Sequence, residues 1–253
     1  VVHMSLDFLP LKTNAYIVEG NALRLDWESV VPKSELNYIM GNPPFVGARL
    51  MDASQKSDVN LIFDGWKNVG NLDYVCCWYK KAADLMLGEK IRGALVSTNS
   101  VSQGESVANL WKPLVESGVH IDFAYRTFRW DSEAKIKAHV HCVIIGFSRA
   151  PNSKDKVLYS SDRAQAVQNI NGYLLDADNV FVESRNTPIC DVPEIGIGNK
   201  PIDGGNYLFT KEEMEQFIKV EPQSQQYFKT WYGSQEFINR HPRYCLWLGD
   251  CSP

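Results

Sequence analysis

The sequence lacks long hydrophobic runs and any excess of basic charge. None of its apolar stretches approaches the roughly 18 residues needed to span a membrane, so we expect no membrane partner. The first residues, Val1–Leu6, do not have the charged and apolar segments of a secretory signal. The net charge is −4, from 26 basic and 30 acidic side chains. That balance argues against a nucleic-acid-binding protein, because such proteins usually carry a basic surface.

The six cysteines are not spaced as a disulfide framework or as a metal site. No two of them have C-x-x-C spacing, and the adjacent pair Cys76 and Cys77 has no partners at ligand spacing. We therefore predict free thiols, no metal, and a cytoplasmic location, where thiols stay reduced.

The first 150 residues alternate short β-branched apolar runs with amphipathic segments. Helices are expected over residues 74–87, ending at Gly88, and over 101–117 with an interruption at Pro113. Such alternation predicts an α/β fold with a parallel sheet and crossover connections. The expected strands are residues 15–18, 36–40, 91–97, 119–124 and 140–147.

From Pro151 the sequence becomes polar and irregular. A linker near 151–156 is followed by strand-like pieces at 173–175 and 180–182 and by a helix at 211–218. We predict two parts, residues 1–150 and 151–253, the second a small irregular α+β module. The first part carries 16 basic and 16 acidic side chains, so the second part carries the whole net charge. Four basic residues of the first part could form a patch, although a solvated mixed face is more common: Arg126, Arg129, Lys135 and Lys137.

The segment Gly41-Asn42-Pro43-Pro44-Phe45 directly follows the strand expected at 36–40. It could simply be a proline-rich turn that ends a strand. However, α/β folds bind their ligands at the carboxyl ends of strands. Two consecutive prolines also fix φ and remove two N–H groups, which makes the turn stiff and leaves its carbonyl groups unpaired. We therefore favour a functional role for this segment.

The chemistry of this segment suits methyl transfer to an amine. The side-chain oxygen of Asn42 and the carbonyl of Pro43 could both accept hydrogen bonds from one planar –NH₂ group. Such a nitrogen is a poor nucleophile, and two acceptors would favour its pyramidal form and direct its lone pair at an electrophile. Phe45 would stack on the flat ring that bears the amine. The predicted catalytic set is Asn42, Pro43, Pro44 and Phe45.

This motif resembles the catalytic motif of S-adenosylmethionine-dependent amino-methyltransferases, chiefly those that make N6-methyladenine in DNA. Nearly the whole chain is similar to the type IIL fused restriction–modification enzymes, the MmeI family. Three stretches of the second part resemble the start of that family's target-recognition region: DGGN at 203–206, GSQEFI at 233–238 and RYCLWL at 243–248. In the first part the resemblance is carried by GNALRLDW at 20–27, GNPPFVGA at 41–48, DYVCCWY at 73–79, VSTNS at 96–100 and HCVIIGF at 141–147.

The resemblance implies a Rossmann-like class I methyltransferase sheet, S-adenosylmethionine as cofactor and double-stranded DNA as partner. Phe128 or Trp130 would close on an adenine flipped out of the duplex, and the resemblance does not choose between them. Asn21 stands where related enzymes often carry an acidic residue. The implied site residues are Asn21 and Asp26 for the cofactor, and Thr98, Asn99, Phe128, Trp130, Arg126 and Arg129 for the target base and DNA.

The sequence departs from the family at the cofactor site. The Gly-rich loop that such enzymes carry after their first strand does not precede Asn42, and the G-x-G at Gly196–Gly198 is expected to be a turn. We therefore expect the chain to be part of a longer enzyme, with a missing N-terminal part as its partner. We expect its incomplete sheet to have an open edge, which favours self-association. We also expect the chain to hold the cofactor weakly.

Two other functions remain open at this point. The four-residue motif also fits enzymes that methylate another planar amine, such as a protein glutamine or an RNA guanine. A non-catalytic DNA-specificity module is the third reading, because the chain has no Gly-rich cofactor loop before its motif.

Overall fold

The computed structural model describes residues 15–130, 140–150, 155–161, 163–193 and 202–249. The chain divides into two compact units, Val1–Asn186 and Thr187–Pro253. The boundary expected near residue 151 falls inside the first unit, because the two strands after it join the sheet of that unit. The division of function between residues 1–150 and 151–253 remains a prediction.

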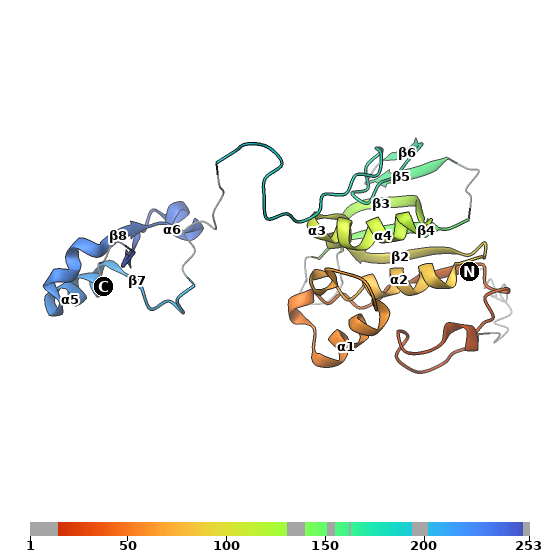
Figure 1. Cartoon of the computed structure of the whole chain (residues 1–253), viewed down its shortest axis with the longest axis horizontal. Coiled ribbons are helices and arrows are strands. Elements are labelled where there is room, and N and C mark those ends of the chain that lie inside the picture. Colours follow the sequence, from red (N-terminus) through yellow and green to blue (C-terminus); the bar gives the residue numbers. More distant parts are fainter. Residues whose placement is uncertain (1–14, 131–139, 151–154, 162, 194–201, 250–253) are drawn as a thin grey trace, which may run out of the picture. The chain divides into compact units, whose positions relative to one another are not determined.

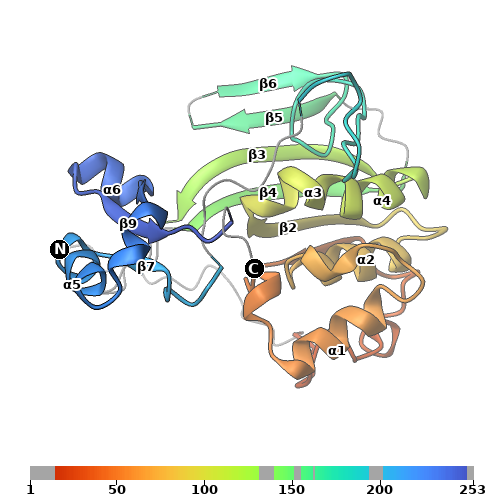
Figure 2. The same cartoon turned by 60° about the vertical axis from the view of Figure 1, so that its left-hand side comes forward.

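The first unit is built on a mixed sheet. In the described residues it has the strand order β1-β2-β4-β3-β5-β6 (Figures 1 and 2). Strands β1, β2, β3 and β5 run in one direction, and β4 and β6 run against them. The strands are β1 (Tyr38–Gly41), β2 (Arg92–Thr98), β3 (His120–Trp130), β4 (Val140–Ser148), β5 (Lys156–Ser160) and β6 (Arg163–Val167).

A wholly parallel sheet was expected, and that expectation was wrong. Too few residues separate Trp130 from Val140 for a crossover, so β4 returns antiparallel beside β3. The four strands that share one direction still end together. We call that end, where Gly41, Thr98, Trp130 and Ser160 close their strands, the carboxyl end of the sheet.

Four of the five strands predicted in the first part are confirmed as β1 to β4, with β3 extending to Trp130. The expected strand at 15–18 is wrong, because that segment has no regular structure. Its side chains Tyr16 and Ile17 are 74% and 87% exposed. A β-branched run forms a strand only when a neighbouring strand pairs with it, and none does here among the described residues.

Helix α2 (Cys76–Leu85) confirms the expected amphipathic helix and ends before Gly88, whose φ is +80°. Its buried face includes Cys76, Cys77 and Tyr79, as expected of packed residues. Tyr79 packs against Trp111 and Phe147, with ring centroids 5.4 and 5.1 Å apart. Helix α1 (Ala53–Ile62), which contacts α2, was not predicted.

The expected helix over 101–117 is confirmed over residues 104–116, although it is not a regular α-helix. A 3-10 turn (Asn99–Ser102), α3 (Gly104–Ser106), a π-helical turn (Val107–Trp111) and α4 (Lys112–Glu116) follow one another. Because the helical run is unbroken from residue 104, Pro113 lies inside it, and its missing N–H removes a hydrogen bond to the preceding turn. The irregular turn thus directly precedes Pro113, which agrees with the interruption expected there.

The second unit has a small antiparallel sheet with the order β7-β9-β8 in its described part. Three phenylalanines, Phe209, Phe217 and Phe228, pack together with ring centroids 5.2 to 6.0 Å apart. The helix predicted at 211–218 is confirmed as α5. The elements are β7 (Leu208–Phe209), α5 (Lys211–Val220), β8 (Phe228–Trp231), α6 (Ser234–Asn239) and β9 (Arg243–Leu246).

The strand-like pieces expected at 173–175 and 180–182 are wrong, because neither forms a strand. The first follows Asn171, whose side-chain oxygen accepts hydrogen bonds from the backbone N–H groups of Tyr173 and Leu175. These bonds curl the chain into a turn, which places Leu174 at a φ of +58°. The turn expected at Gly196–Gly198 lies outside the described residues, as does most of the expected linker.

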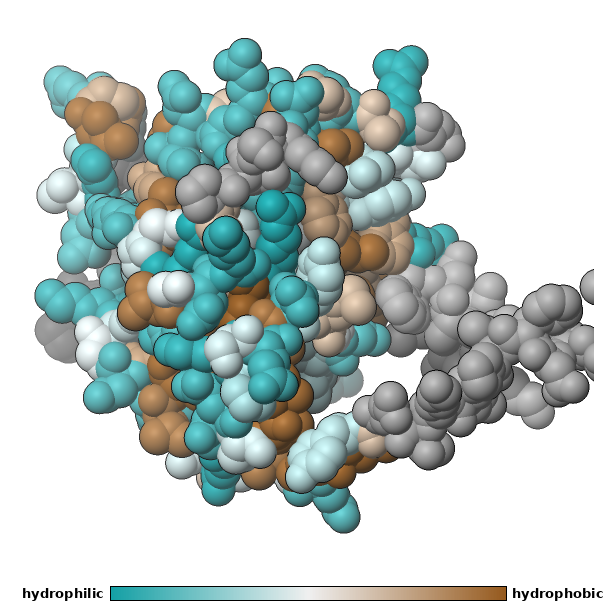
Figure 3. All heavy atoms as spheres, turned by 90° about the vertical axis from the view of Figure 1, so that its right-hand side faces the viewer, coloured by the Kyte–Doolittle hydropathy of each residue, from teal (hydrophilic) through white to brown (hydrophobic). Residues whose placement is uncertain are grey.

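Within the described residues, no helix is long and apolar enough to cross a lipid bilayer. On the face shown in Figure 3, hydrophilic residues are interspersed with hydrophobic ones. Among the same described residues all five cysteines are free, and Cys76, Cys77 and Cys142 are buried.

Candidate functional site

The predicted catalytic segment lies directly after β1, at the carboxyl end of the sheet. Pro43 is buried and anchors the turn, whereas Asn42 and Pro44 are exposed. Phe45 is half-buried. Beyond it, the carbonyl of Val46 accepts a hydrogen bond of 2.9 Å from the backbone N–H of Tyr74. The segment is therefore held on both sides while Asn42 faces outward.

A cleft of about 770 Å³ lies beside this segment. Its walls come from residues 20–22, from Trp27 to Leu36, from β1 and the catalytic segment, and from the start of α2. Asn21 and Asn42 both line it, together with the aromatic rings of Trp27, Tyr74 and Trp78. Mostly apolar walls with a few polar groups are typical of a small-molecule site. The structure thus brings one of the two expected cofactor residues to the catalytic motif.

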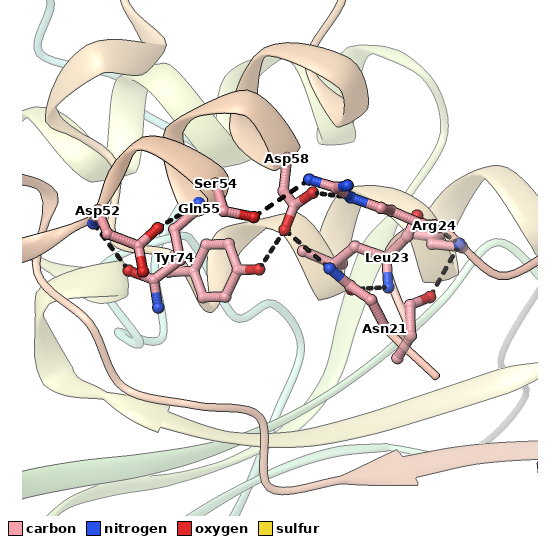
Figure 4. A network of polar contacts seen from close by, with 10 residues as sticks. Asn21, Leu23, Arg24, Asp52, Ser54, Gln55, Asp58 and Tyr74 are labelled. Carbon is pink, nitrogen blue, oxygen red and sulfur yellow. Dashed lines mark hydrogen bonds and ion pairs between the residues drawn. The ribbon is translucent and has the colours of Figure 1, made fainter. Parts of the chain in front are cut away.

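Asp58 of α1 fixes the segment that carries Asn21 (Figure 4). Its Oδ2 accepts hydrogen bonds from Asn21 Nδ2 at 3.0 Å and from the hydroxyl of Tyr74 at 2.6 Å. Its Oδ1 accepts one from Arg24 Nε at 2.6 Å. The side-chain oxygen of Asn21 in turn accepts from the N–H of Leu23 at 2.9 Å. Both ends of the Asn21 amide are therefore engaged in holding its own loop.

The electrostatics of this network favour a charged carboxylate. Burial raises the pKa of Asp58, but hydrogen bonds from Tyr74, Arg24 and Asn21 outweigh that effect and hold the pKa below its usual range. Burial, together with the hydrogen bond to Asp58, raises the pKa of Tyr74. Tyr74 therefore stays a neutral donor to a negative acceptor at neutral pH.

Lys81 of α2 holds the same loop from the other side. Its ammonium donates hydrogen bonds to the carbonyls of Ala22, Leu23 and Leu25, at 2.9, 2.8 and 2.5 Å. It also lies 5.2 Å from the ring centre of Trp27. Burial lowers the pKa of Lys81, and nearby Asp26 partly offsets this. Residues 20–27 are thus fixed by two helices before any ligand is present.

A second polar cluster lies at the end of β2, beside Gly47, which follows the catalytic segment. The hydroxyl of Thr98 donates to Asp73 Oδ2 at 2.8 Å, and the hydroxyl of Ser100 donates to the same oxygen. The other carboxylate oxygen of Asp73 lies beside Gly47. A Cβ atom added to Gly47 would be 3.7 Å from that oxygen, in van der Waals contact. We call Asp73, Thr98 and Ser100 the Asp73 cluster. It joins the end of β2 and the start of α2 beside the catalytic segment.

The remaining predicted cofactor and base residues lie elsewhere. Asp26 is exposed and caps a 3-10 helix by accepting from the N–H of Glu28 at 3.0 Å, and it does not line the cleft. Thr98 and Asn99 do not line it either. Phe128 is half-buried, with its ring edge-on to that of Tyr125 at 5.3 Å. The roles expected for these four residues therefore remain predictions.

The predicted DNA contacts lie along β3. Arg126 Nε donates to the carbonyl of Leu174 at 2.9 Å, and Arg129 is exposed and pairs with His141 in the strand ladder. The side chain of Trp130 lies outside the described part, and so do Lys135 and Lys137 of the expected basic patch.

Sequence reasoning missed the residues that support the site. Asp58, Lys81 and Asp73 received no role, although Asp73 and Tyr74 both lie in the stretch DYVCCWY that resembles the family. Asp58 carries no sequence signal, because its partners Asn21 and Arg24 are 37 and 34 positions away. Only the fold brings these residues together.

Comparison with known proteins identifies the family. Residues 2–160 match the family described as the MmeI DNA-methyltransferase domain, and residues 176–253 match the MmeI target recognition domain. The chain is 42% identical over 244 residues to DNA methyltransferase A of Bacillus subtilis (strain 168), covering 96% of this chain and 28% of that protein.

A solved structure agrees with these matches. The type IIL restriction–modification enzyme MmeI in complex with DNA superposes with a TM-score of 0.86 at 43% identity, over 97% of this chain and 34% of that one. The chain thus spans about a third or less of each relative's length. The expected class I methyltransferase type of α/β fold is confirmed by this likeness. The chain belongs to the MmeI family, whose DNA-methyltransferase and target recognition domains it matches in that order.

Proposed function

We propose that this chain carries the catalytic motif and the start of the target-recognition region of a site-specific DNA adenine-N6 methyltransferase of a restriction–modification system. The observation that supports this most is the cleft in which Asn21 and the segment Asn42–Pro44 meet. The family of the chain supports DNA as the substrate. We place the enzyme in the cytoplasm, because buried free thiols such as Cys76 suit a reducing compartment.

In this mechanism, the Asn42 side-chain oxygen and the Pro43 carbonyl accept hydrogen bonds from the adenine amine. Their rigid placement after β1 orients the nitrogen lone pair and favours its pyramidal form, so the chain needs no general base before attack. Pro44 keeps the turn stiff, and Phe45 stacks on the flipped base. S-adenosylmethionine, when bound, supplies an electrophilic methyl group.

The residues of the cleft fit an adenosyl group. Asn21 and the ring of Trp27 stand on a loop already fixed by Asp58 and Lys81, so little ordering is needed on binding. We keep Asp26, which caps the 3-10 helix that follows this loop, as the second proposed cofactor contact. Because the chain has no Gly-rich loop before Asn42, we expect calorimetry on this chain to find affinity for S-adenosylmethionine weaker than micromolar. Micromolar binding would contradict this.

The remaining residues are proposed to serve the DNA. Phe128 or Trp130 covers the second face of the flipped base, and Thr98 and Asn99 lie at the strand end that borders it. Arg126 and Arg129 contact the duplex. Residues 151–253 begin the part that reads the target sequence, in line with the match of residues 176–253 to a target recognition domain.

Substitution of Asn42 tests the catalytic assignment. This chain would replace the matching region of DNA methyltransferase A, and the chimera would be assayed with tritiated S-adenosylmethionine. We expect Asn42→Ala to lower methylation at least 100-fold with less than a threefold change in DNA affinity, since one of two amine acceptors is lost. Asn60→Ala, at an exposed position of α1, is the matched control and should be active.

The same assay separates the three functions. Duplex DNA, RNA and protein would be offered in parallel, and the methylated DNA base identified after hydrolysis. Label in N6-methyladenine supports the proposal, whereas label in RNA or protein supports a different amine. An inactive unsubstituted chimera that still binds DNA would favour the non-catalytic specificity module.

A further inference from the structure

A second hollow lies on the first unit away from the catalytic cleft. It has a volume of about 650 Å³ and is formed by β3 and by the hairpin of β5 and β6. We call it the hairpin hollow. Its lining includes Arg126, Leu158, Ser160, Arg163 and Gln165.

The strand register places four of these side chains on one face. In the antiparallel hairpin, Leu158 stands opposite Gln165, and Ser160 stands opposite Arg163. Residues two apart on a strand share a face, so Leu158 and Ser160 point the same way, as do Arg163 and Gln165. Leu158 is buried and forms the floor, whereas Ser160, Arg163 and Gln165 are exposed. The outer part of the hollow is therefore polar.

Arg126 enters the hollow from β3 in a fixed orientation. Its Nε donates to the carbonyl of Leu174 at 2.9 Å, and the side chain is half-buried. This bond uses one of the five N–H donors of the guanidinium and holds its plane. A guanidinium that is already oriented loses less entropy when it binds an anion.

The chemistry of the hollow suits a phosphate. Two guanidinium groups, a hydroxyl and a side-chain amide line it, and none of its described lining residues is acidic. Arginine pairs with phosphate oxygens through two parallel hydrogen bonds, which makes it the preferred residue for planar recognition of such groups. The ligand is thus an anion with several acceptor oxygens.

The position of the hollow points to the DNA backbone as the source of that phosphate. Ser160 closes β5 at the carboxyl end of the sheet, where Asn42 follows β1. With strands about 4.8 Å apart, β3 and β5 lie three and four steps from β1, or about 14 and 19 Å. A duplex along this end would span that distance in about four to six base pairs, at 3.4 Å per pair.

We propose that the hairpin hollow binds a backbone phosphate of the DNA duplex that flanks the target base, through Arg126 and Arg163. This rests on the proposed function, in which DNA is the substrate. The contact is independent of sequence: it positions the duplex and leaves base recognition to other residues.

Salt dependence of DNA binding by this chain tests the proposal. The affinity for a labelled 30-base-pair duplex of mixed sequence would be measured between 50 and 200 mM NaCl. For the double variant, which combines Arg126→Ala and Arg163→Ala, we expect a five- to twentyfold loss of DNA affinity at 50 mM NaCl. The slope of log K against log[salt] should fall by about one, the value for one phosphate contact. Lys90→Ala, an exposed position just before β2 and so at the opposite end of the sheet, is the control.

The two single variants distinguish the loss of a phosphate contact from a loss of folding. Arg126→Ala also loses the bond to Leu174, whereas Arg163→Ala changes an exposed side chain and should still lower the slope. If the double variant keeps the salt slope of the unsubstituted chain, the hollow does not bind a DNA phosphate. The proposed function would still stand in that case. No DNA binding by the unsubstituted chain counts against both.

A free anion is the other source of a phosphate, and a second arm separates it. Thermal unfolding would be followed with and without 10 mM sodium phosphate at constant ionic strength. One outcome is that phosphate stabilises the unsubstituted chain but not the double variant, while the double variant binds DNA normally. That result would assign the hollow to a free anion and overturn the proposal.

Discussion

At the scale of single residues, Asp58 connects more of the site than any residue of the catalytic motif. Its carboxylate accepts from Asn21, Arg24 and Tyr74, which come from two separate segments (Figure 4). The Asp58 residue is only 1% exposed, so removing its charge leaves the buried hydroxyl of Tyr74 without a strong acceptor. Such losses cost more than the hydrogen bonds themselves gain, because the donors remain desolvated.

Asp58→Asn should therefore destabilise the chain. At pH 7 we expect the free energy of unfolding to fall by about 2 to 4 kcal/mol, from the loss of charge-assisted hydrogen bonds at a buried position. Urea unfolding followed by tryptophan fluorescence measures it. Asp64→Asn, at an exposed position just after α1, should change stability by less than about 0.5 kcal/mol.

The same carboxylate predicts a pH dependence with a definite sign. The pKa of Asp58 is lower in the folded chain than in an unfolded chain, where it is about 3.9. Its contribution is therefore present above about pH 4 and is lost as the pH falls through the folded-state pKa. The unsubstituted chain should lose stability between pH 5 and pH 3 more steeply than Asp58→Asn. Equal slopes in the two proteins would contradict this.

Sequence alone indicated the chemistry of Asn42 and Pro43 because backbone and side chain act there within one short turn. It did not indicate how Asn21 is held. Asn21 was interpreted as a cofactor contact, whereas its side-chain amide binds Asp58 and the N–H of Leu23. Bonds between residues so far apart depend on tertiary packing, which leaves no local pattern to read.

At the scale of elements, the Asp73 cluster joins the end of β2 to the start of α2, beside Gly47, which follows the catalytic segment. Tyr74, the next residue, bonds the carbonyl of Val46 through its N–H and Asp58 through its hydroxyl. The start of α2 therefore touches the catalytic segment, the end of β2 and the loop that carries Asn21. A shift at this point would move Asn42 relative to the cofactor loop.

We expect Asp73→Asn to slow methylation rather than weaken DNA binding. An amide oxygen is a weaker acceptor than a carboxylate for Thr98 and Ser100, and a misplacement of about 1 Å near reacting groups can cost on the order of 100-fold in rate. In the chimeric enzyme, kcat should fall 10- to 100-fold with the KM for DNA within threefold. Asp84→Asn, at an exposed aspartate of α2, is the control.

Ser100→Ala gives a graded check on this reading. It removes one of the two hydroxyl donors to Asp73 but keeps the carboxylate and the bond from Thr98. Its kcat should lie between those of the unsubstituted enzyme and Asp73→Asn. A rise in the KM for DNA without a change in kcat would mean that the cluster serves DNA binding, contrary to our expectation.

The sequence predicts a helix where the spacing of its apolar residues matches the helix face that is buried. The apolar face of α2 is fully buried, so its spacing was visible in the sequence. In α1 only Asp58 and Val59 are buried, which leaves almost no apolar stripe. Its one clear signal was the capping box of Asp52 and Gln55. The run at 15–18 had strand composition, but burial and pairing decide strands, and it has neither.

At the scale of the whole molecule, the two units explain why composition was a poor guide to function. The net charge of −4 averages over both units and says nothing of where charge converges. Two arginines line the hairpin hollow, and none of its described lining residues is acidic. The net charge of the chain therefore does not argue against the phosphate contact proposed there.

The open edge expected of the sheet is found at β1, which pairs only with β2 among the described residues. Tyr38 and Met40 are 67% and 80% exposed there. An unpaired strand with apolar side chains is a template for pairing with another chain. We therefore expect this chain to self-associate, with a weight-average mass in sedimentation experiments that rises with concentration.

Met40→Lys should weaken that association, because a charged side chain on an edge strand must lose its hydration to pair. We expect a five- to tenfold higher dissociation constant than for the unsubstituted chain. Leu87→Lys is the matched control, since Leu87 is 64% exposed just beyond α2 and away from the strand. If both variants weakened association equally, general surface hydrophobicity would be the cause. If the chain stayed monomeric up to about 100 μM, the edge of β1 would not mediate self-association.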